Sequence, residues 1–215
     1  MTYSSAEQLF LKDKSTIFNE VSSKFLPQLL QASYQENKTI VDTFEKLFSE
    51  GKAYLKALGL NVFWDEEQTY PVIRQDFSKI SCSNLNEIRQ DLLNLIKAEF
   101  TRLGFDVDGI SSSSPTDFFS AVMVGVKTKV VFIFENYDFM FIKAKEASDD
   151  LQREINVFYQ TLSSVVKANA EQYGRFTLLT VSGTLKNYGA ILGPMYARDI
   201  TSGFISNTEP ESQDY

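Results

Sequence analysis

Three acidic residues stand close to the ends of expected strands, where carboxylates are suited to metal binding or proton transfer. Glu135 and Asp138 follow the apolar, β-branched run of residues 128–134, and Asp76 ends the run that starts at Pro71. Because carboxylate oxygens are the ligands that magnesium prefers, Glu135 and Asp138 are candidates for a metal site and Asp76 is a candidate catalytic acid. The alternative interpretation is that all three are solvated loop residues or helix caps.

The residue counts exclude several other kinds of chemistry. The chain has 215 residues, no histidine and one cysteine, Cys82, which excludes Ser-His-Asp catalysis, Cys-His catalysis and most zinc sites. The net charge of −7 argues against nucleic-acid binding, which needs a basic face. No apolar run is long enough for a membrane span, and the start of the chain lacks the pattern of a signal peptide. We therefore expect a cytoplasmic protein, including one delivered into the cytosol of a host cell, with no structural metal.

The elements that must position these residues follow from the hydrophobic periodicity, in which strand-like and helical segments alternate. Such alternation predicts an α/β fold with a mainly parallel sheet and helices on both faces, in three layers. No interior linker is visible, so we expect one domain over residues 1–205 and a polar, disordered tail over 206–215. We expect helices over residues 40–58, 85–103, 116–124 and from 148 onward, and strands over residues 71–77, 128–134, 176–181 and 199–205.

Short segments between residues 8 and 205 are similar to those of a known family. The most specific is YPVIRQDFS at residues 70–78, and the others are FLKDKS (10–15), NKT (37–39), LFSEGK (47–52), FENYD (134–138), LTVSG (179–183) and DIT (199–201). In this order they resemble the AAA-ATPase-like domain, a P-loop domain often found in front of a PD-(D/E)XK nuclease-like domain. The resemblance implies a P-loop-NTPase-like sheet and a site for ATP and magnesium.

The resemblance assigns Lys38 and Thr39 to a nucleotide-binding remnant. In the family a glycine precedes the lysine, because the backbone there must bend tightly and present amide groups to the phosphates. Here Asn37 takes the place of that glycine, and Glu36 adds a negative charge beside a site for a polyanion. The alternative is that Lys38 is an exposed lysine near the start of an ordinary helix.

The resemblance also places Glu135 and Asn136 where family members have Asp-Glu at the end of a strand. The family's aspartate holds magnesium and its glutamate orients the attacking water. Glu135 still offers a carboxylate for a metal, whereas Asn136 cannot accept a proton.

These departures predict a degenerate P-loop domain, a pseudo-ATPase that acts as a protein-binding, regulatory or effector module. We therefore assign no catalytic residue and no bound cofactor, and we expect a protein partner but neither membrane nor nucleic acid. Residues Phe139 and Phe141 have strand spacing and are one candidate surface for that partner. Two alternatives are a weak Mg-dependent ATPase that uses Lys38, Thr39 and Glu135, and a viral or phage accessory protein.

Overall fold

The centre of the molecule is a parallel sheet built on two apolar strands. The computed structural model describes residues 5–23, 28–31, 34–182 and 198–199. The strand order is β2-β3-β4-β1-β5, and every strand pair is parallel. The strands expected over residues 128–134 and 176–181 are the second and third in this order, which confirms their central position. The bounds are Gln28–Gln31 for β1, Val72–Asp76 for β2, Val130–Glu135 for β3, Gly174–Val181 for β4 and Arg198–Asp199 for β5.

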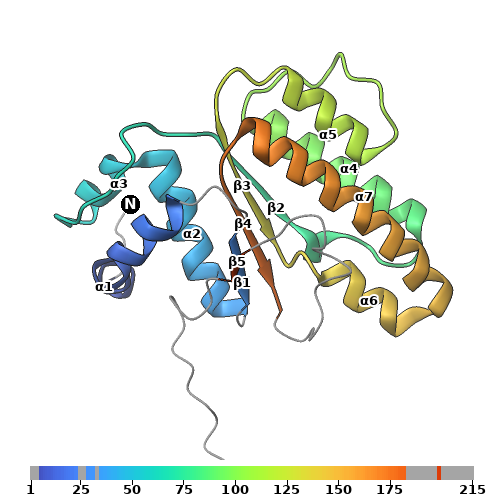
Figure 1. Cartoon of the computed structure of the whole chain (residues 1–215), viewed down its shortest axis with the longest axis horizontal. Helices are drawn as coiled ribbons and strands as arrows, with labels where there is room; N and C mark the ends of the chain where they lie inside the picture. Colours follow the sequence, from blue (N-terminus) through green and yellow to red (C-terminus); the bar gives the residue numbers. More distant parts are fainter. Residues whose placement is uncertain (1–4, 24–27, 32–33, 183–197, 200–215) are drawn as a thin grey trace, which may run out of the picture.

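Helices cover both faces of the sheet (Figure 1). On one face lie α1 (Ser5–Ser22), α2 (Tyr34–Glu50) and α3 (Lys52–Ala57). On the other lie α4 (Leu85–Arg102), α5 (Pro115–Val124), α6 (Phe139–Ala147) and α7 (Asp149–Tyr173), together with the short 3₁₀ helix η1 (Phe77–Lys79) that follows β2. The predicted three-layer α/β fold of the P-loop type is therefore confirmed.

The two faces of the sheet bury separate hydrophobic clusters because side chains alternate along a strand. Val72, Val131 and Ile133 pack with α1–α3. Ile73, Phe132 and Phe134, from neighbouring positions, pack with α4–α7. All six residues of β3 are buried, as the apolar run predicts for a strand covered on both sides.

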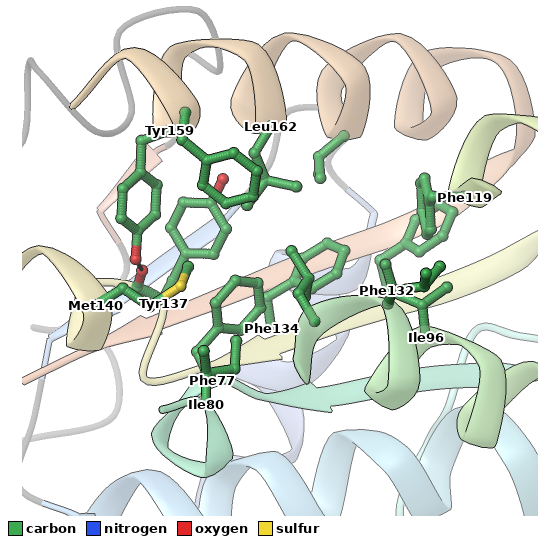
Figure 2. Packing of buried hydrophobic residues seen from close by; sticks show 14 of the residues in the cluster. Phe77, Ile80, Ile96, Phe119, Phe132, Phe134, Tyr137, Met140, Tyr159 and Leu162 are labelled. Atoms are coloured by element: carbon green, nitrogen blue, oxygen red, sulfur yellow. Dashed lines mark hydrogen bonds between the residues drawn. The ribbon is translucent and has the colours of Figure 1, made fainter. Parts of the chain in front are cut away.

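Aromatic rings link the sheet to α7 (Figure 2). Tyr137 lies between Phe77 and Tyr159, with ring centroids 5.0 and 5.4 Å away in edge-to-face contacts. The hydroxyl of Tyr159 donates to the backbone carbonyl of Tyr137, and that of Tyr137 hydrogen-bonds to Ser163. These contacts fix the turn between β3 and α6, which carries Asn136 and Asp138.

Local signals set most of the helix ends. Asn84 caps α4 by accepting a hydrogen bond from the amide of Glu87, and Ser148 caps α7. The cap of α5 is Ser114, so the helix begins at Pro115, one residue before the expected start at 116, because proline is favoured at the first helical position. The helix expected over residues 40–58 is divided into α2 and α3 at Gly51, whose φ is +57°.

Phe139 and Phe141 belong to α6 rather than to a strand. Both side chains are half-buried and pack against the cluster beneath α4–α7, so the strand-like spacing is misleading here, while the partner surface stays a prediction. The chain turns directly after β3, where the amide of Phe139 donates to the carbonyl of Asn136 at 2.9 Å, and continues as helix α6.

Two expectations fall partly outside the described residues. Of the strand expected over residues 199–205, the structure describes only Asp199, in β5. The tail over 206–215 lies outside the described residues. None of the described helices combines the length and the apolar character that crossing a bilayer requires.

Candidate functional site

A hollow of about 490 Å³ lies beside β2, between α2 and α4, and all of its lining residues are charged. It gathers four acids and four bases, so its chemistry is that of ion pairs rather than of an apolar ligand pocket. We call it the charged hollow. It is lined by Lys38, Glu45, Arg74, Asp76, Lys79, Glu99, Arg102 and Glu135.

Arg74 of β2 holds the acids of the charged hollow together. Its Nε and Nη2 donate to the two carboxylate oxygens of Glu135 at 2.5 and 3.0 Å. Its Nη1 donates to Asp42 Oδ1 at 2.7 Å and to Glu45 Oε2 at 2.6 Å. The paired bonds to Glu135 are the fork geometry that makes arginine–carboxylate contacts strong. The guanidinium of Arg74 thus donates hydrogen bonds to three carboxylates.

The sequence explains why these groups converge. Asp42 and Glu45 are three residues apart on α2 and therefore share one face of the helix. Arg74 and Glu135 lie on adjacent strands, in which Asp76 is the register partner of Glu135. The side chains of Arg74 and Glu135 are 23% and 12% exposed, so their pairing takes place largely away from water.

The acids keep Arg74 charged. Burial alone lowers the pKa of its guanidinium, but the hydrogen bonds and negative charge of Glu135, with hydrogen bonds from Glu45 and Asp42, hold that pKa well above its ordinary value. An arginine is in any case not deprotonated in proteins. The cation of this cluster is therefore permanent.

Two residues of α4 close the free edge of β2. Glu99 accepts a hydrogen bond from the backbone amide of Arg74 at 2.8 Å, and Arg102 donates to the carbonyl of Val72 at 3.2 Å. Glu99 and Arg102 are themselves an ion pair at 2.7 Å. Side chains that occupy the backbone groups of an edge strand prevent another strand from pairing there.

Lys38 and Thr39 lie inside α2 and not in a loop. Because α2 begins at Tyr34, only the first four amides of the helix lack an intrahelical acceptor, and the amides of Lys38 and Thr39 come after them. Lys38 is exposed and lines the charged hollow. Thr39 is exposed, does not line it, and accepts a hydrogen bond from Thr43 through its carbonyl.

Asn136 joins the ends of three strands. Its side-chain amide donates to Asp76 at 2.8 Å and its backbone amide donates to Thr180 Oγ1 at 3.0 Å. Its φ is +51°, a left-handed conformation that asparagine tolerates better than most residues. Burial raises the pKa of Asp76, but hydrogen bonds from Ser78 and Asn136 outweigh it and lower that pKa. Asp76 is thus held as a structural carboxylate.

Asp138 is fully buried and anchors the end of β4. Its Oδ2 accepts hydrogen bonds from the amide of Ser182 at 3.0 Å and from the hydroxyl of Ser182 at 2.9 Å. Its Oδ1 has no hydrogen-bond partner among the described residues. Burial raises the pKa of Asp138 despite the bonds from Ser182, which lower it.

The arrangement does not fit magnesium and ATP as a P-loop enzyme would hold them. That chemistry needs a free carboxylate for the metal and backbone amides around the phosphates. Both oxygens of Glu135 already accept from Arg74, and helix α2 includes the residues just before Lys38. Among the described residues no group of acidic or cysteine side chains is arranged to hold a metal. The assignments of Glu135 to a metal and of Lys38 and Thr39 to a nucleotide stay predictions.

Sequence reasoning missed Arg74, although it quoted the segment that contains it. The sequence held one signal: Arg74 interrupts the apolar residues of an expected strand, and a charge in a strand that is covered on both faces needs a carboxylate partner, because unpaired buried charges are costly. Glu135, at the end of another strand, was a visible candidate.

Comparison with known proteins gives the family. A family sequence model with the description "Predicted AAA-ATPase" (AAA-ATPase-like) matches residues 23–187. No curated protein matches the chain. The match spans well over half of the 215 residues and includes every residue of the charged hollow. The chain therefore belongs to the AAA-ATPase-like family.

Proposed function

We propose that this domain is a pseudo-ATPase, a member of the family that no longer hydrolyses ATP and works as a protein-binding or regulatory module. The observation that carries the proposal is the contact between Arg74 and both carboxylate oxygens of Glu135. In the family resemblance Glu135 stands at the position of the residue that holds magnesium. Here that carboxylate already serves a permanent internal cation.

Magnesium would have to displace Arg74 to reach Glu135. The displaced guanidinium would lose both of its contacts with Glu135, the most buried of its three partners, and keep only those with Asp42 and Glu45. Breaking a buried ion pair costs up to about 3–5 kcal/mol. A nucleotide–metal complex would have to supply that free energy before any binding was measurable.

The phosphate side of the site supports the same conclusion. Lys38 can reach anions in the charged hollow, but the hollow also presents Glu45, Asp76 and Glu99, whose charges repel phosphate. Asn136, at the position of the water-orienting glutamate, donates its side-chain amide to Asp76. Loss of a general base alone slows a reaction by roughly 10²–10⁴-fold.

A folded domain of this family that does not hydrolyse ATP can still act by binding another protein, and this is the regulatory role that we propose. We place it in a reducing cytosol, where the one cysteine, Cys82, stays free as it is in the structure. A protein partner is expected, and one surface for it is developed below.

A second candidate function is a weak Mg-dependent ATPase. It is favoured by one observation, that Lys38 and Glu135 line the same hollow although 97 positions separate them in the chain. In that case Arg74 would have to leave Glu135 when the nucleotide binds.

A phosphate-release assay with ATP and magnesium separates the two candidates. We expect purified protein to release no phosphate above background, and Lys38→Ala and Glu135→Gln to leave that baseline unchanged. Lys79→Ala, which removes another exposed lysine of the same hollow, is the matched control. Steady turnover that disappears in Lys38→Ala and Glu135→Gln but persists in Lys79→Ala would establish the ATPase instead.

A further inference from the structure

The segment between α3 and β2 presents an aromatic side chain to solvent. Phe63 is 76% exposed, whereas its neighbour Trp64 is 3% exposed and packs edge-to-face on Phe48 at a centroid distance of 5.4 Å. In Figure 1 this segment lies at the side of the molecule away from α4–α7. A single exposed ring is common on protein surfaces, so the surroundings of Phe63 decide whether it belongs to a contact site.

The exposure of Phe63 is fixed by the fold. Asn19 of α1 donates to the carbonyl of Phe63 at 2.7 Å and accepts from the amide of Asp65 at 3.0 Å. These two bonds hold the backbone on both sides of Trp64 while the indole is buried. Gln8 of α1 donates to the carbonyl of Leu58 at 2.9 Å and holds the start of the same segment. The outward position of Phe63 is therefore a consequence of these contacts with α1 and of the burial of Trp64.

A hollow adjoins the exposed ring. It has a volume of about 570 Å³, and Phe63 and Trp64 line it together with Leu55, Leu60 and Val62. We call it the Phe63 hollow. Apolar side chains thus form part of its wall, a lining that suits an aromatic side chain of the type that stands beside it.

Charges of both signs surround the Phe63 hollow. Lys52 and Lys56 line it, and exposed Asp65 and Glu67 follow Trp64 in the same segment. Lys52 pairs with Glu67 at 3.0 Å, while no described residue forms a salt bridge with Lys56 or Asp65. The charges around the Phe63 hollow thus cancel, although the chain has a net charge of −7. Two copies can therefore meet at this surface without the electrostatic repulsion that the negative charge elsewhere on the chain causes.

We propose that this surface binds a second copy of the chain in a two-fold symmetric dimer. Phe63 of each copy enters the Phe63 hollow of the other, and Lys56 of each copy faces Asp65 of the other. In a two-fold symmetric contact the same surface of each copy meets that of the other. The surface must therefore carry both the protruding side chain and the hollow that receives it, and charges of both signs. This patch does so. The inference is independent of whether the domain hydrolyses ATP.

Sedimentation equilibrium over roughly 1–200 μM tests the proposal, because it measures mass directly. We expect wild type to dimerise and Phe63→Ser to weaken the dimer at least ~30-fold, the size of effect typical of a buried aromatic anchor. Val124→Ser is the matched control, since Val124 is equally exposed at 76% but lies on α5, across the sheet, and it should dimerise as wild type does.

Trp64 gives a second readout, because it is the single tryptophan of the chain and lines the Phe63 hollow. Its emission should change on dilution through the dissociation range in wild type and in Val124→Ser, and stay constant in Phe63→Ser. Wild type that remains a monomer at 200 μM, or a Phe63→Ser variant that dimerises like wild type, would overturn the proposal. A monomer would leave the hollow to a different partner.

Discussion

Arg74→Met removes the cation that binds Glu135, Asp42 and Glu45, and keeps a side chain of similar length. Glu135, with 12% of its side chain exposed, then loses both of its hydrogen bonds from the guanidinium. Breaking a buried ion pair costs about 3–5 kcal/mol. Asp42 and Glu45 are 36% and 28% exposed and recover water, so we expect the lower end, a loss of about 3 kcal/mol in unfolding free energy.

Urea denaturation at neutral pH measures this loss, and thermal unfolding gives an independent value. For a chain of this size 1 kcal/mol corresponds to roughly 2–4 °C in Tm, so the variant should melt about 6–12 °C lower. Lys79→Met is the control, because Lys79 is exposed in the same hollow, and it should change the unfolding free energy by less than about 0.5 kcal/mol.

A double variant separates charge from packing. Arg74→Met with Glu135→Met replaces the pair by two apolar side chains and leaves no uncompensated charge at its centre, so it should be more stable than Arg74→Met alone. Magnesium at millimolar concentration should raise the Tm of Arg74→Met and leave that of wild type unchanged, because only the variant frees carboxylates for a cation. If Arg74→Met were as stable as Lys79→Met, the guanidinium would not be the group that holds these acids.

Three further predictions concern pH and packing. Burial raises the folded-state pKa of Asp138, so this group lowers the unfolding free energy as pH rises through that pKa. The variant Asp138→Asn should therefore have a higher unfolding free energy than wild type between about pH 5 and 8, and this gain should disappear near pH 4. A difference that is constant with pH would contradict this. Burial also raises the pKa of Asp76, but its hydrogen bonds lower it overall, so Asp76→Asn should show the opposite trend, a cost at neutral pH that fades on acidification. A Cβ at Gly174 would lie 2.4 Å from the carbonyl oxygen of Ala170, so Gly174→Ala should cost about 1–3 kcal/mol in urea denaturation, whereas Gly109→Ala, with no atom within 4 Å, should not.

Local signals made much of the fold predictable from sequence. The run that forms β3 is apolar and rich in β-branched residues, which predicts a buried strand. The stretch that forms α4 is amphipathic and preceded by Asn84, which predicts a capped helix. Helix α6 was missed because Phe139 and Phe141 have the spacing of a strand, whereas their burial is set by packing against the cluster beneath α4–α7. Such tertiary effects leave no local signature.

The candidate site was less predictable, since it depends on which elements meet. Lys38 and Glu135 were named from the family resemblance, and the structure brings them to one hollow. Arg74 was not named, because its role depends on Asp42 and Glu45 of α2, and the sequence does not show that these two residues face β2. A charged residue in a buried strand indicates that a partner exists, but the sequence does not say from which helix it comes.

The central claim is that the Arg74–Glu135 contact excludes magnesium and nucleotide. Its most direct test is an equilibrium titration of wild type with a fluorescent ATP analogue in the presence of magnesium, with Lys38→Ala and Glu135→Gln in parallel. The account predicts no saturable binding below millimolar nucleotide, and curves for both variants that match wild type. Saturable micromolar binding by wild type that Lys38→Ala weakens and Glu135→Gln abolishes would contradict it.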